Sequence, residues 1–438
     1  MLHKVGKLAL PLLLCLIVLA VMLPGCSSST TTAPTTSVVA TTSAPTSTTM
    51  APPPQNEILI GASRDLTGPQ AGFQEFGAPP IYKMWIDEIN AAGGLEVAGK
   101  KLPIRLIEYD DGSDTAACVR NIEKLCTQDK VNFLFGPTGT SMLFAAAPIA
   151  NKYKTIMVCM EGGATTLESK LGGLPYVFSP LNYSNHFQMP VFVDLCVSKG
   201  AKTAFVIAMN DLHGAEYNTA FQGEAALKGL TVLDSVTIPV TITDINSVVQ
   251  AAKAANPDVV CVFAYPNQNI LFMNTAMALN FSPKILLVGP GCNFGFFNLM
   301  YGAALEGVIG EGAWNAKSSA KAAVFAPKAE KAVGGPGNMD WWGAIVYYSA
   351  VEFLGQAIQK AGTLDNEVVR KIMYTEKFET TIGTFYWEQV NGGGCLLPQA
   401  VYAGQIGQWQ KGVFEVIDND NKATAPMLYP KPAWPPAQ

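Results

Sequence analysis

From residue 57 onward, the sequence alternates short apolar runs with longer stretches of helical periodicity, and this alternation restricts the possible folds more than any other feature. The runs Glu57–Ser63, Leu102–Tyr109 and Phe133–Phe135 have the length and composition of buried strands. The stretches Phe76–Ala92 and Thr115–Gln128 between them predict helices. Repeated βα units of this kind form a parallel sheet that is covered by helices on both faces. The sequence therefore predicts an α/β protein.

A second series of alternating segments follows between residues 184 and 288. A chain of 438 residues is long enough for two domains or one large two-lobed unit. Beyond this series, the Ala- and Lys-rich sequence at 316–333 and the glycines up to Gly337 predict loops. Trp341–Lys360 predicts a long helix, and the proline-rich tail from Lys422 predicts an extended segment.

The first 56 residues have the composition of a targeting segment and a linker. Lys4 and Lys7 precede an apolar run that ends at Leu23-Pro-Gly-Cys26, which resembles a bacterial lipobox. We expect residues 1–25 to be a lipoprotein signal peptide and Cys26 to carry the lipid. An uncleaved membrane helix is the alternative, although the run is short for a span. Residues 26–56 are rich in Ser, Thr, Ala and Pro and predict a flexible tether. The expected location is extracytoplasmic, lipid-anchored to the cell membrane.

Composition and motifs argue against several functions. The formal net charge of -5 gives no indication of nucleic-acid binding. The nine cysteines include no CxxC spacing, and most of those in the globular body are interpreted as small buried residues. Only three histidines occur, and no G-x-S-x-G, H-E-x-x-H or phosphate-binding loop is present. We expect neither an enzyme nor a cofactor or metal site.

The turn Gly136–Ser141 is the first candidate for ligand binding. It follows the apolar run Phe133–Phe135, offers the hydroxyls of Thr138, Thr140 and Ser141, and precedes a helix that is predicted over 142–150. Free N–H groups and the helix dipole favour an anion at such a helix start. The turn contains no lysine or arginine, so we expect a small carboxylate held by neutral donors. An ordinary βα turn with a Ser/Thr cap is the alternative.

Other turns lie where predicted strands end. In open α/β sheets, ligands bind outside the carboxyl ends of the strands. The candidate turns are Asp65–Phe73, Gly136–Ser141, Glu161–Thr165, Met209–Gly214, Ala264–Asn267 and Gly289–Gly295.

Several of these segments together resemble one family. Ile60–Pro69, Asp87–Gly94 and Leu106–Asp111 are similar to the opening of the Leu/Ile/Val-binding solute receptors of bacterial ABC importers. Gly136–Ser141 and Gly162–Thr165 continue the similarity, which covers the chain from about residue 57 to its end. The resemblance implies type I periplasmic binding architecture, with two Rossmann-like lobes joined by a three-stranded hinge. It implies lobe 1 at 57–181 and 313–400, and lobe 2 at 182–312 and 401–438.

The resemblance also implies which residues bind ligand. By matching positions, Thr140, Gly163 and Thr165 would hold the ligand carboxylate, with Ser141 beside them. Aromatic and imidazole side chains would form the walls, since they supply contact area. These wall residues are Phe73 from the first lobe, Tyr183, His213 and Tyr265 from the second, and Trp341 or Trp342 closing the pocket. Each wall residue has an alternative role in ordinary packing or, for His213, in helix capping.

One departure from the family concerns the ligand. Family members that bind amino acids place an acid after the Gly-Pro turn, whereas this chain has Gly291, and the neutral pair 184–185 occupies a second acidic position. A buried ammonium without a carboxylate partner is costly. We therefore expect an aromatic or short organic acid without an α-amino group. A hydrophobic amino acid, such as a branched-chain one, and a ligand sensor of the same fold are the alternatives. We expect a monomer that delivers its ligand to an ABC permease.

Overall fold

The computed structural model describes residues 56–162, 173–181, 187–391, 396–400, 404–418 and 422–436. The predicted signal peptide, Cys26 and nearly all of the predicted tether lie outside these residues. So do three of the predicted ligand-binding residues, Gly163, Thr165 and Tyr183.

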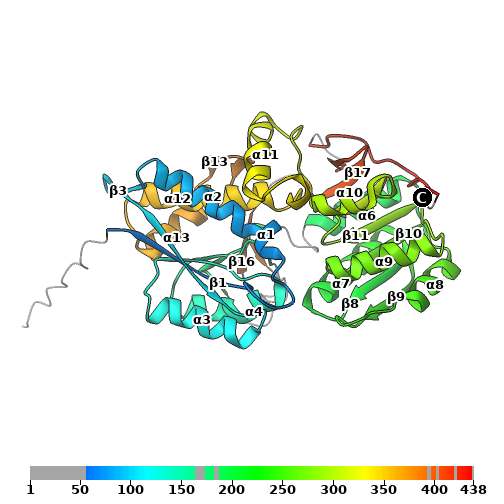
Figure 1. The fold of residues 1–438 in the computed structure, drawn as a ribbon, viewed down its shortest axis with the longest axis horizontal. Coiled ribbons are helices and arrows are strands. Elements are labelled where there is room, and N and C mark those ends of the chain that lie inside the picture. The colour runs from blue at the N-terminus through cyan, green and yellow to red at the C-terminus, as the bar shows by residue number, and fades with distance from the viewer. Residues whose placement is uncertain are drawn as a thin grey trace, which may run out of the picture. The chain divides into compact units, whose positions relative to one another are not determined.

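The first lobe is built on a parallel sheet with strand order β4-β1-β5-β6-β7. Its strands are β1 (Ile58–Arg64), β4 (Ile104–Asp110), β5 (Phe133–Phe135), β6 (Met157–Val158) and β7 (Val177–Phe178). One face is covered by α2 (Ala78–Ala91), α11 (Ala320–Ala332), α12 (Ala344–Ala361) and α13 (Asn366–Thr375). The other face carries α3 (Thr115–Thr127) and α4 (Thr140–Lys152) (Figure 1). The predicted strand Phe133–Phe135 and the helix that follows it are confirmed.

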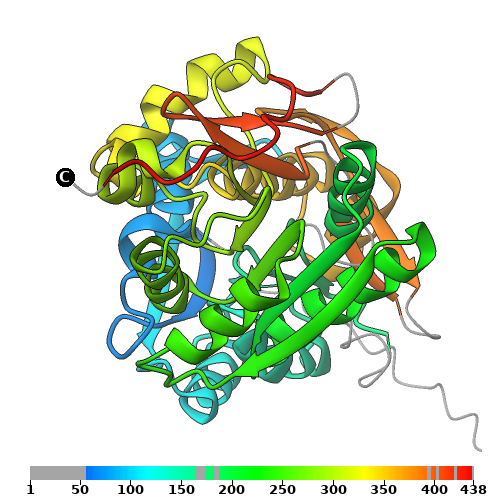
Figure 2. The same ribbon diagram turned by 90° about the vertical axis from the view of Figure 1, so that its right-hand side faces the viewer.

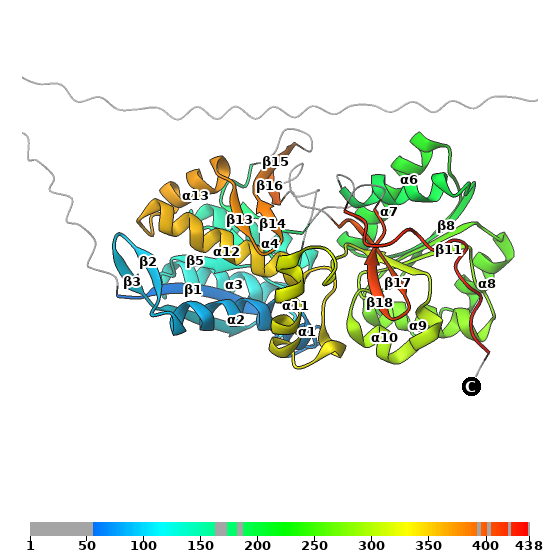
Figure 3. The same ribbon diagram turned by 90° about the horizontal axis from the view of Figure 1, so that it is seen from above.

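The second lobe has a seven-stranded sheet with the order β18-β17-β12-β11-β10-β8-β9. Its parallel strands are β8 (Thr203–Met209), β9 (Thr231–Ile238), β10 (Val259–Phe263), β11 (Ile285–Gly289) and β12 (Val308–Glu311). The strands β17 (Ile406–Gln410) and β18 (Val413–Val416) join it antiparallel. One face carries α6 (Met189–Ser198) and α7 (Leu212–Lys228). The other carries α8 (Asn246–Ala255), α9 (Pro266–Ala278) and α10 (Gly295–Tyr301), as Figure 3 shows.

The central strands of each sheet are buried on both faces, which explains why they are almost wholly apolar. All five residues of β10 and all five of β11 are buried. In the first lobe, Phe135 of β5 packs against Tyr82 of α2 with ring centroids 4.8 Å apart. Full burial of a large apolar side chain contributes about 1.5–3 kcal/mol. The α/β prediction with two parallel-sheet lobes is confirmed.

The chain passes between the lobes at three places: after β7, after β12 and before β17. The last two crossings are hydrogen-bonded to each other. Gly312 N donates to Gln405 O at 2.6 Å, and Ala313 N donates to Gly404 O at 2.8 Å. The crossing after β7 includes residues outside those the structure describes. Glu311, the last residue of β12, therefore lies where the second crossing leaves the sheet of lobe 2.

The predicted loop at 316–333 is wrong, because α11 occupies Ala320–Ala332. Ser319 caps this helix by accepting a hydrogen bond from Ala322 N at 3.0 Å. Alanine and lysine have high helix propensity, and the helix buries Phe325 against the first lobe. The Ala- and Lys-rich composition that was interpreted as a loop is in fact favourable for a helix.

Two predicted helices begin later than expected. The helix predicted over 76–92 is interrupted at Gly77, which separates α1 (Phe73–Phe76) from α2. A Cβ on Gly77 would lie 1.8 Å from Glu161 Oε1, so only glycine fits there. The helix predicted from Trp341 begins at Ala344, because Asp340 accepts hydrogen bonds from the backbone N–H groups of residues 342 and 343.

Short elements that the sequence did not predict complete the fold. They are the hairpins β2–β3 (Leu95–Val97, Lys100–Leu102), β13–β14 (Phe378–Thr380, Gly383–Phe385) and β15–β16 (Trp387–Asn391, Leu396–Ala400), and the 3₁₀ turns η2 (Gly302–Leu305) and η3 (Pro336–Asn338).

The tail from Lys422 is extended as predicted, with neither helix nor strand over 422–436. It lies along the second lobe (Figure 2), where Lys431 N donates to Lys284 O at 2.8 Å. Trp434 Nε1 donates to Phe281 O at 2.7 Å. The tail is therefore a packed part of lobe 2.

The cysteines that the structure describes are all free, and the expectation that most of them are small buried residues is confirmed. Five are buried and Cys126 is half-buried. Burial raises the pKa of the Cys196 thiol and of the other buried thiols, so they behave as small apolar residues.

Candidate functional site

The turn that joins β5 to α4 lies at the carboxyl edge of the first sheet. Gly139 has a φ of 82°, in the region that favours glycine, and no side chain caps α4. Thr140 and Ser141 form the first turn of this helix, Thr140 buried and Ser141 exposed. An N-terminus without a side-chain cap presents backbone N–H groups and the positive end of the helix dipole. This geometry suits a carboxylate.

A residue of the second lobe lies directly beside this turn. A Cβ placed on Gly139 would be 3.8 Å from the hydroxyl oxygen of Tyr265. Tyr265 precedes α9, and its hydroxyl hydrogen-bonds the carboxylate of Asp211. Asp211 in turn caps α7 by accepting from Gly214 N at 2.8 Å. The starts of α4, α7 and α9 therefore converge, with both lobes contributing.

A buried ion pair holds the α4 turn in position. Arg64, at the end of β1, is 1% exposed and contacts the carboxylate of Glu161, which follows β6. Arg64 Nη1 donates to Gly136 O at 3.0 Å, so the guanidinium joins the carboxyl ends of three neighbouring strands. Glu161 Oε1 also accepts from Ala78 N at 2.8 Å, at the start of α2.

Asp65 completes this cluster as its second buried acid. Its Oδ1 accepts from Thr138 Oγ1 and from Gln74 Nε2, each at 2.7 Å, and lies 3.9 Å from Arg64 Nη2. Its Oδ2 is buried without a hydrogen-bond partner among the described residues. Burial raises the pKa of Glu161, although the Arg64 charge opposes that shift. One arginine thus faces two buried acids.

From the sequence, the Thr138 hydroxyl is expected to be available to a ligand, and the turn itself contains no lysine or arginine. The structure shows that the Thr138 hydroxyl is engaged by Asp65. The charge beneath the turn is that of Arg64, which Glu161 neutralises. The signal that was missed is the pair Arg64-Asp65 directly after an apolar strand, since charges placed there are buried.

His213 and Tyr265, both predicted as wall residues, contact each other at the second-lobe side. Their rings are stacked with centroids 5.3 Å apart. His213 also lies 4.5 Å from the ring of Tyr217, one turn later on α7. Burial lowers the pKa of His213 to about 3, while a hydrogen bond to the backbone of Gly289 opposes that shift. The imidazole is therefore neutral at physiological pH.

A group of polar side chains near the lobe crossings was not predicted. Glu311 and Gln188 are fully buried, and His213 is 6% exposed. Within the described residues, neither carboxyl oxygen of Glu311, nor Gln188 Nε2, nor His213 Nε2 has a hydrogen-bond partner. Tyr217 lies among them, and its hydroxyl contacts Gln188 Oε1. We call Glu311, Gln188, His213 and Tyr217 the crossing cluster.

Glu311 carries the most unusual electrostatics of the crossing cluster. Burial raises its pKa well above the ordinary value, and the neighbouring Tyr217 hydroxyl offsets the shift only in part. A Cβ on Gly289 would lie 2.9 Å from Glu311 Oε1, so glycine is needed beside the carboxyl group. The sequence signal for Glu311 was an acid that ends the apolar run Val308–Gly310.

The predicted aromatic wall residue Phe73 lies at a contact between the lobes. Its ring is 5.0 Å from Phe76 and 6.2 Å from Phe294 of the second lobe. Phe76 is also 4.7 Å from Phe294 and 5.6 Å from Phe296. The structure thus brings Phe73 into a cluster of phenylalanines that spans both lobes.

The two tryptophans lie beside the second crossing. Trp341 is half-buried, packs against the cores of both lobes, and has its ring 5.2 Å from that of Trp314. Trp342 is buried with its ring against Gly312, and its Nε1 has no hydrogen-bond partner among the described residues. Both tryptophans contact the second crossing. Like the members of the crossing cluster, Trp342 combines burial with a polar atom that has no hydrogen-bond partner among the described residues.

Gly291 lies in the turn after β11, and its backbone conformation disfavours any residue with a side chain there. Its φ is 126°, and a Cβ would lie 3.0 Å from Pro266 Cγ. The expectation that no acidic side chain at this edge of the sheets could pair with a ligand ammonium is nevertheless too broad. The structure places Asp65, Glu161, Asp211 and Glu311 at strand ends, and three of these acids accept hydrogen bonds within the protein.

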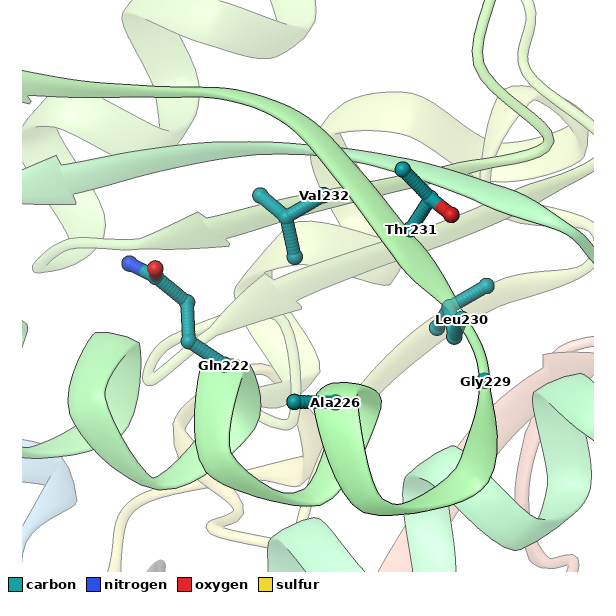
Figure 4. A pocket seen from close by; sticks show the side chains of 6 residues that line it. All are labelled: Gln222, Ala226, Gly229, Leu230, Thr231 and Val232. Carbon is teal, nitrogen blue, oxygen red and sulfur yellow. The ribbon is translucent and has the colours of Figure 1, made fainter.

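A separate groove of about 340 Å³ lies between the end of α7 and the start of β9 (Figure 4). It is lined by Gln222, Ala226, Gly229, Leu230, Thr231 and Val232. It is at the amino end of β9, opposite the edge where the α4 and α7 N-termini converge. We therefore do not assign ligand binding to it.

Two further structural findings concern metals and membranes. The described residues include no group of three or more His, Cys, Asp or Glu side chains that could hold a metal ion. No helix in the same part of the chain combines the length and apolar character that a membrane crossing requires.

Two parallel-sheet lobes with helix N-termini converging at their carboxyl edges define the class of two-lobed solute-binding proteins. The family model described as periplasmic binding protein matches residues 57–411. The chain therefore belongs to the periplasmic binding protein family, which binds solutes and is not enzymatic. The family resemblance inferred from the motifs is confirmed at this level.

Individual relatives are distant. A Leu/Ile/Val-binding protein homolog from Brucella abortus is 24% identical over 245 residues, which are 54% of this chain and 58% of the relative. The alignment thus spans little more than half of that relative's length.

Solved structures show the same fold. A solute-binding protein of an ABC transporter from Rhodopseudomonas palustris, in complex with 3,4-dihydroxybenzoic acid, is 22% identical with a TM-score of 0.67, covering 87% of this chain and 98% of that one. A branched-chain amino acid transporter substrate-binding protein from Streptococcus pneumoniae, in complex with isoleucine, is 20% identical with a TM-score of 0.66, covering 82% and 98%.

Proposed function

We propose that this protein is the extracytoplasmic receptor of an ABC importer and binds a small organic carboxylate between its lobes. The observation that carries the proposal is the α4 N-terminus, which has no side-chain cap and lies beside Tyr265 of the other lobe. A ligand held there would contact both lobes, and binding would favour the arrangement in which they meet. Thr140 and Ser141 would hold the carboxylate, together with Gly163 and Thr165.

The proposed ligand lacks an α-amino group. The ammonium of an amino acid is bonded to the carbon that bears the carboxylate, so its partner must lie close to the α4 N-terminus. Asp211 already caps α7 and accepts a hydrogen bond from Tyr265, and Asp65 accepts hydrogen bonds from Thr138 and Gln74. Glu161 is paired with Arg64, and the raised pKa of Glu311 favours its neutral form. An aromatic or short organic acid avoids the cost of burying an ammonium.

The main competing proposal is a hydrophobic amino acid whose ammonium meets Asp211. The names of the Brucella relative and the isoleucine complex of the Streptococcus protein support this alternative, as the dihydroxybenzoate complex supports the first. A sensor that reports ligand occupancy to a signalling partner would use the same pocket. Under all three proposals, lipidation at Cys26 would hold the receptor at the membrane as a monomer.

Calorimetric titration decides between the ligand classes when each acid differs from an amino acid only by the amino group. Leucine should be compared with 4-methylpentanoate, and phenylalanine with 3-phenylpropanoate, with benzoate as a smaller aromatic acid. We expect the deaminated acid of each pair to bind more tightly. Tighter binding of leucine or phenylalanine would support the amino-acid alternative instead.

A variant of the α4 turn tests where the carboxylate binds. Thr140→Val removes a hydroxyl at constant volume and should weaken binding by about 1.5–3 kcal/mol, the usual cost of a hydrogen bond to a charged group. Ser319→Ala is the matched control, because it removes the hydroxyl that caps α11 and should lower stability without changing affinity. Unchanged affinity in Thr140→Val would remove this hydroxyl from the site.

A further inference from the structure

The crossing cluster contains buried polar atoms that have no hydrogen-bond partner among the described residues. Buried polar groups in folded proteins are nearly always hydrogen-bonded, because an unpartnered group loses its hydration without compensation. Among the residues that the structure describes, both carboxyl oxygens of Glu311, Gln188 Nε2 and His213 Nε2 are exceptions to this rule. Each residue comes from a different segment: the end of β12, the residue before α6, and the first turn of α7.

These groups converge around a common point. The backbone of Gly289 hydrogen-bonds the His213 ring, and the same glycine packs against the Glu311 carboxyl group. The Tyr217 ring contacts the His213 ring, and the Tyr217 hydroxyl contacts Gln188. Donors and acceptors are both present, since an amide NH₂, an imidazole and a carboxyl group share the space.

The position of the cluster relative to the α4 turn indicates what it would receive. Tyr265 places its hydroxyl beside Gly139, and the face of its ring stacks on His213. Tyr265 therefore links the two places, because its hydroxyl lies at the α4 turn while its ring contacts His213 of the crossing cluster. A polar group on the same carbon as the ligand carboxylate would stay at the α4 turn, whereas a group at the far end of a flat ring can reach the crossing cluster.

We propose that the crossing cluster is a distal polar subsite that binds a ligand hydroxyl group, with Glu311 as its principal partner, so that the ligand is a hydroxylated aromatic acid. This inference rests on the proposed binding of a carboxylate at the α4 turn. The hydroxyl would donate to or accept from Glu311, His213 and Gln188, which thereby gain the partners they lack. All three are buried here, so a ligand reaches them when the lobes separate and then meet around it.

The test compares 4-hydroxybenzoate with benzoate by calorimetry, since the two probes differ only in the distal hydroxyl. The unmodified protein should bind 4-hydroxybenzoate at least tenfold more tightly, because benzoate leaves the buried polar groups unpaired. Glu311→Met should lose at least tenfold more affinity for 4-hydroxybenzoate than for benzoate. Glu311→Gln, which keeps hydrogen-bonding capacity, should retain most of the preference.

Two controls separate a subsite from a structural role. Glu352→Met removes a partly buried carboxyl group of the first lobe, which accepts from Thr381 N, and should leave the preference for the hydroxylated acid intact. Ligand-free Glu311→Met should melt at a higher temperature than the unmodified protein, because an apolar side chain replaces an unpartnered buried carboxyl group. If Glu311→Met does not fold, His213→Phe should show the same selective loss.

The outcomes also distinguish this inference from the proposed function. Binding of both probes with equal affinity, or an equal loss for both in Glu311→Met, would overturn the subsite while leaving the carboxylate site intact. If amino acids bind and neither aromatic acid does, the ligand class proposed above fails, and the subsite fails with it.

Discussion

Replacing Arg64 with methionine should destabilise the protein strongly, because it removes the only positive charge of a buried cluster that the structure shows to contain Glu161 and Asp65. Methionine retains much of the side-chain volume but carries no charge. Arg64 and Glu161 are 1% and 4% exposed in their side chains, so solvent screens their interaction little.

The expected magnitude follows from the groups left behind. Removing one partner of a buried ion pair typically costs about 3–5 kcal/mol, since the remaining charge stays buried without compensation. The carbonyl of Gly136 also loses its 3.0 Å hydrogen bond. These effects overlap, so we expect a total loss of about 3–5 kcal/mol near pH 8, a large share of the stability of a typical domain. The variant should also bind ligand less well, because Arg64 holds the α4 turn.

The destabilisation should depend on pH with a definite sign. Burial already raises the pKa of Glu161 in the native protein, and loss of Arg64 removes the charge that opposes this shift. A carboxyl group whose pKa is higher in the folded state binds a proton that the unfolded state releases. Stability therefore falls as the pH rises from the unfolded value of about 4.3 to the folded pKa, by up to about 1.4 kcal/mol per pH unit. The variant should be least destabilised near pH 5 and most near pH 8.

Urea unfolding followed by tryptophan fluorescence at pH 5, 6, 7 and 8 measures both effects. Arg105→Met is the matched control, because it breaks an exposed pair with Glu57 and should change stability little at any pH. The double variant Arg64→Met, Glu161→Gln should recover part of the loss, since it removes the stranded carboxylate. A small loss of stability in Arg64→Met, or a loss that does not grow with pH, would refute the assigned role of the buried charge.

The remaining predictions concern the membrane anchor and lobe movement. Cys26→Ser should release the mature protein from membranes into the soluble fraction, as fractionation and immunoblotting would show; retention at the membrane would contradict lipidation at this residue. Small-angle scattering should give a smaller radius of gyration at saturating ligand, because each lobe supplies half of the pocket. Phe294→Ala should weaken the contact with Phe73 and Phe76 between the lobes and so enlarge the radius of gyration without ligand. An unchanged radius in this variant would show that these rings do not hold the lobes together.

Much of the fold was predictable from local sequence, because strands buried on both faces are continuous apolar runs and some of the helices between them begin at a capping residue. Phe133–Phe135 and the α3 cap at Asp114 follow directly from these signals. The error at α11 arose because the Ala- and Lys-rich composition of 316–333 was interpreted as a loop, whereas these residues and the Ser319 cap favour a helix. Strands β17 and β18 were not predicted, since they gain their stability by pairing with β12, far away in sequence.

The candidate site also has parts that could be predicted from the sequence and parts that could not. The turns that contain Thr140, His213, Tyr265 and Gly291 could be named because they follow apolar runs and the carboxyl ends of parallel strands meet at one edge. The roles of His213, Tyr265 and Gly291 came from the family resemblance. Arg64 with Glu161, and Glu311 with Gln188, could not be paired from the sequence, since the members of each pair are 97 and 123 positions apart (161 minus 64 and 311 minus 188). Whether a polar residue is buried, and beside which partner, depends on how distant segments pack.

The sequence by itself thus determined the two α/β lobes, the edge at which a ligand would bind and the helix start suited to a carboxylate, because these features depend on hydrophobic periodicity and turn residues within short segments. Only the tertiary structure revealed the ion pair beneath the α4 turn and the groups of the crossing cluster that have no hydrogen-bond partner among the described residues. The physical reason is that burial and hydrogen-bond partners are properties of packed segments, and a residue far away in sequence can supply or withhold them.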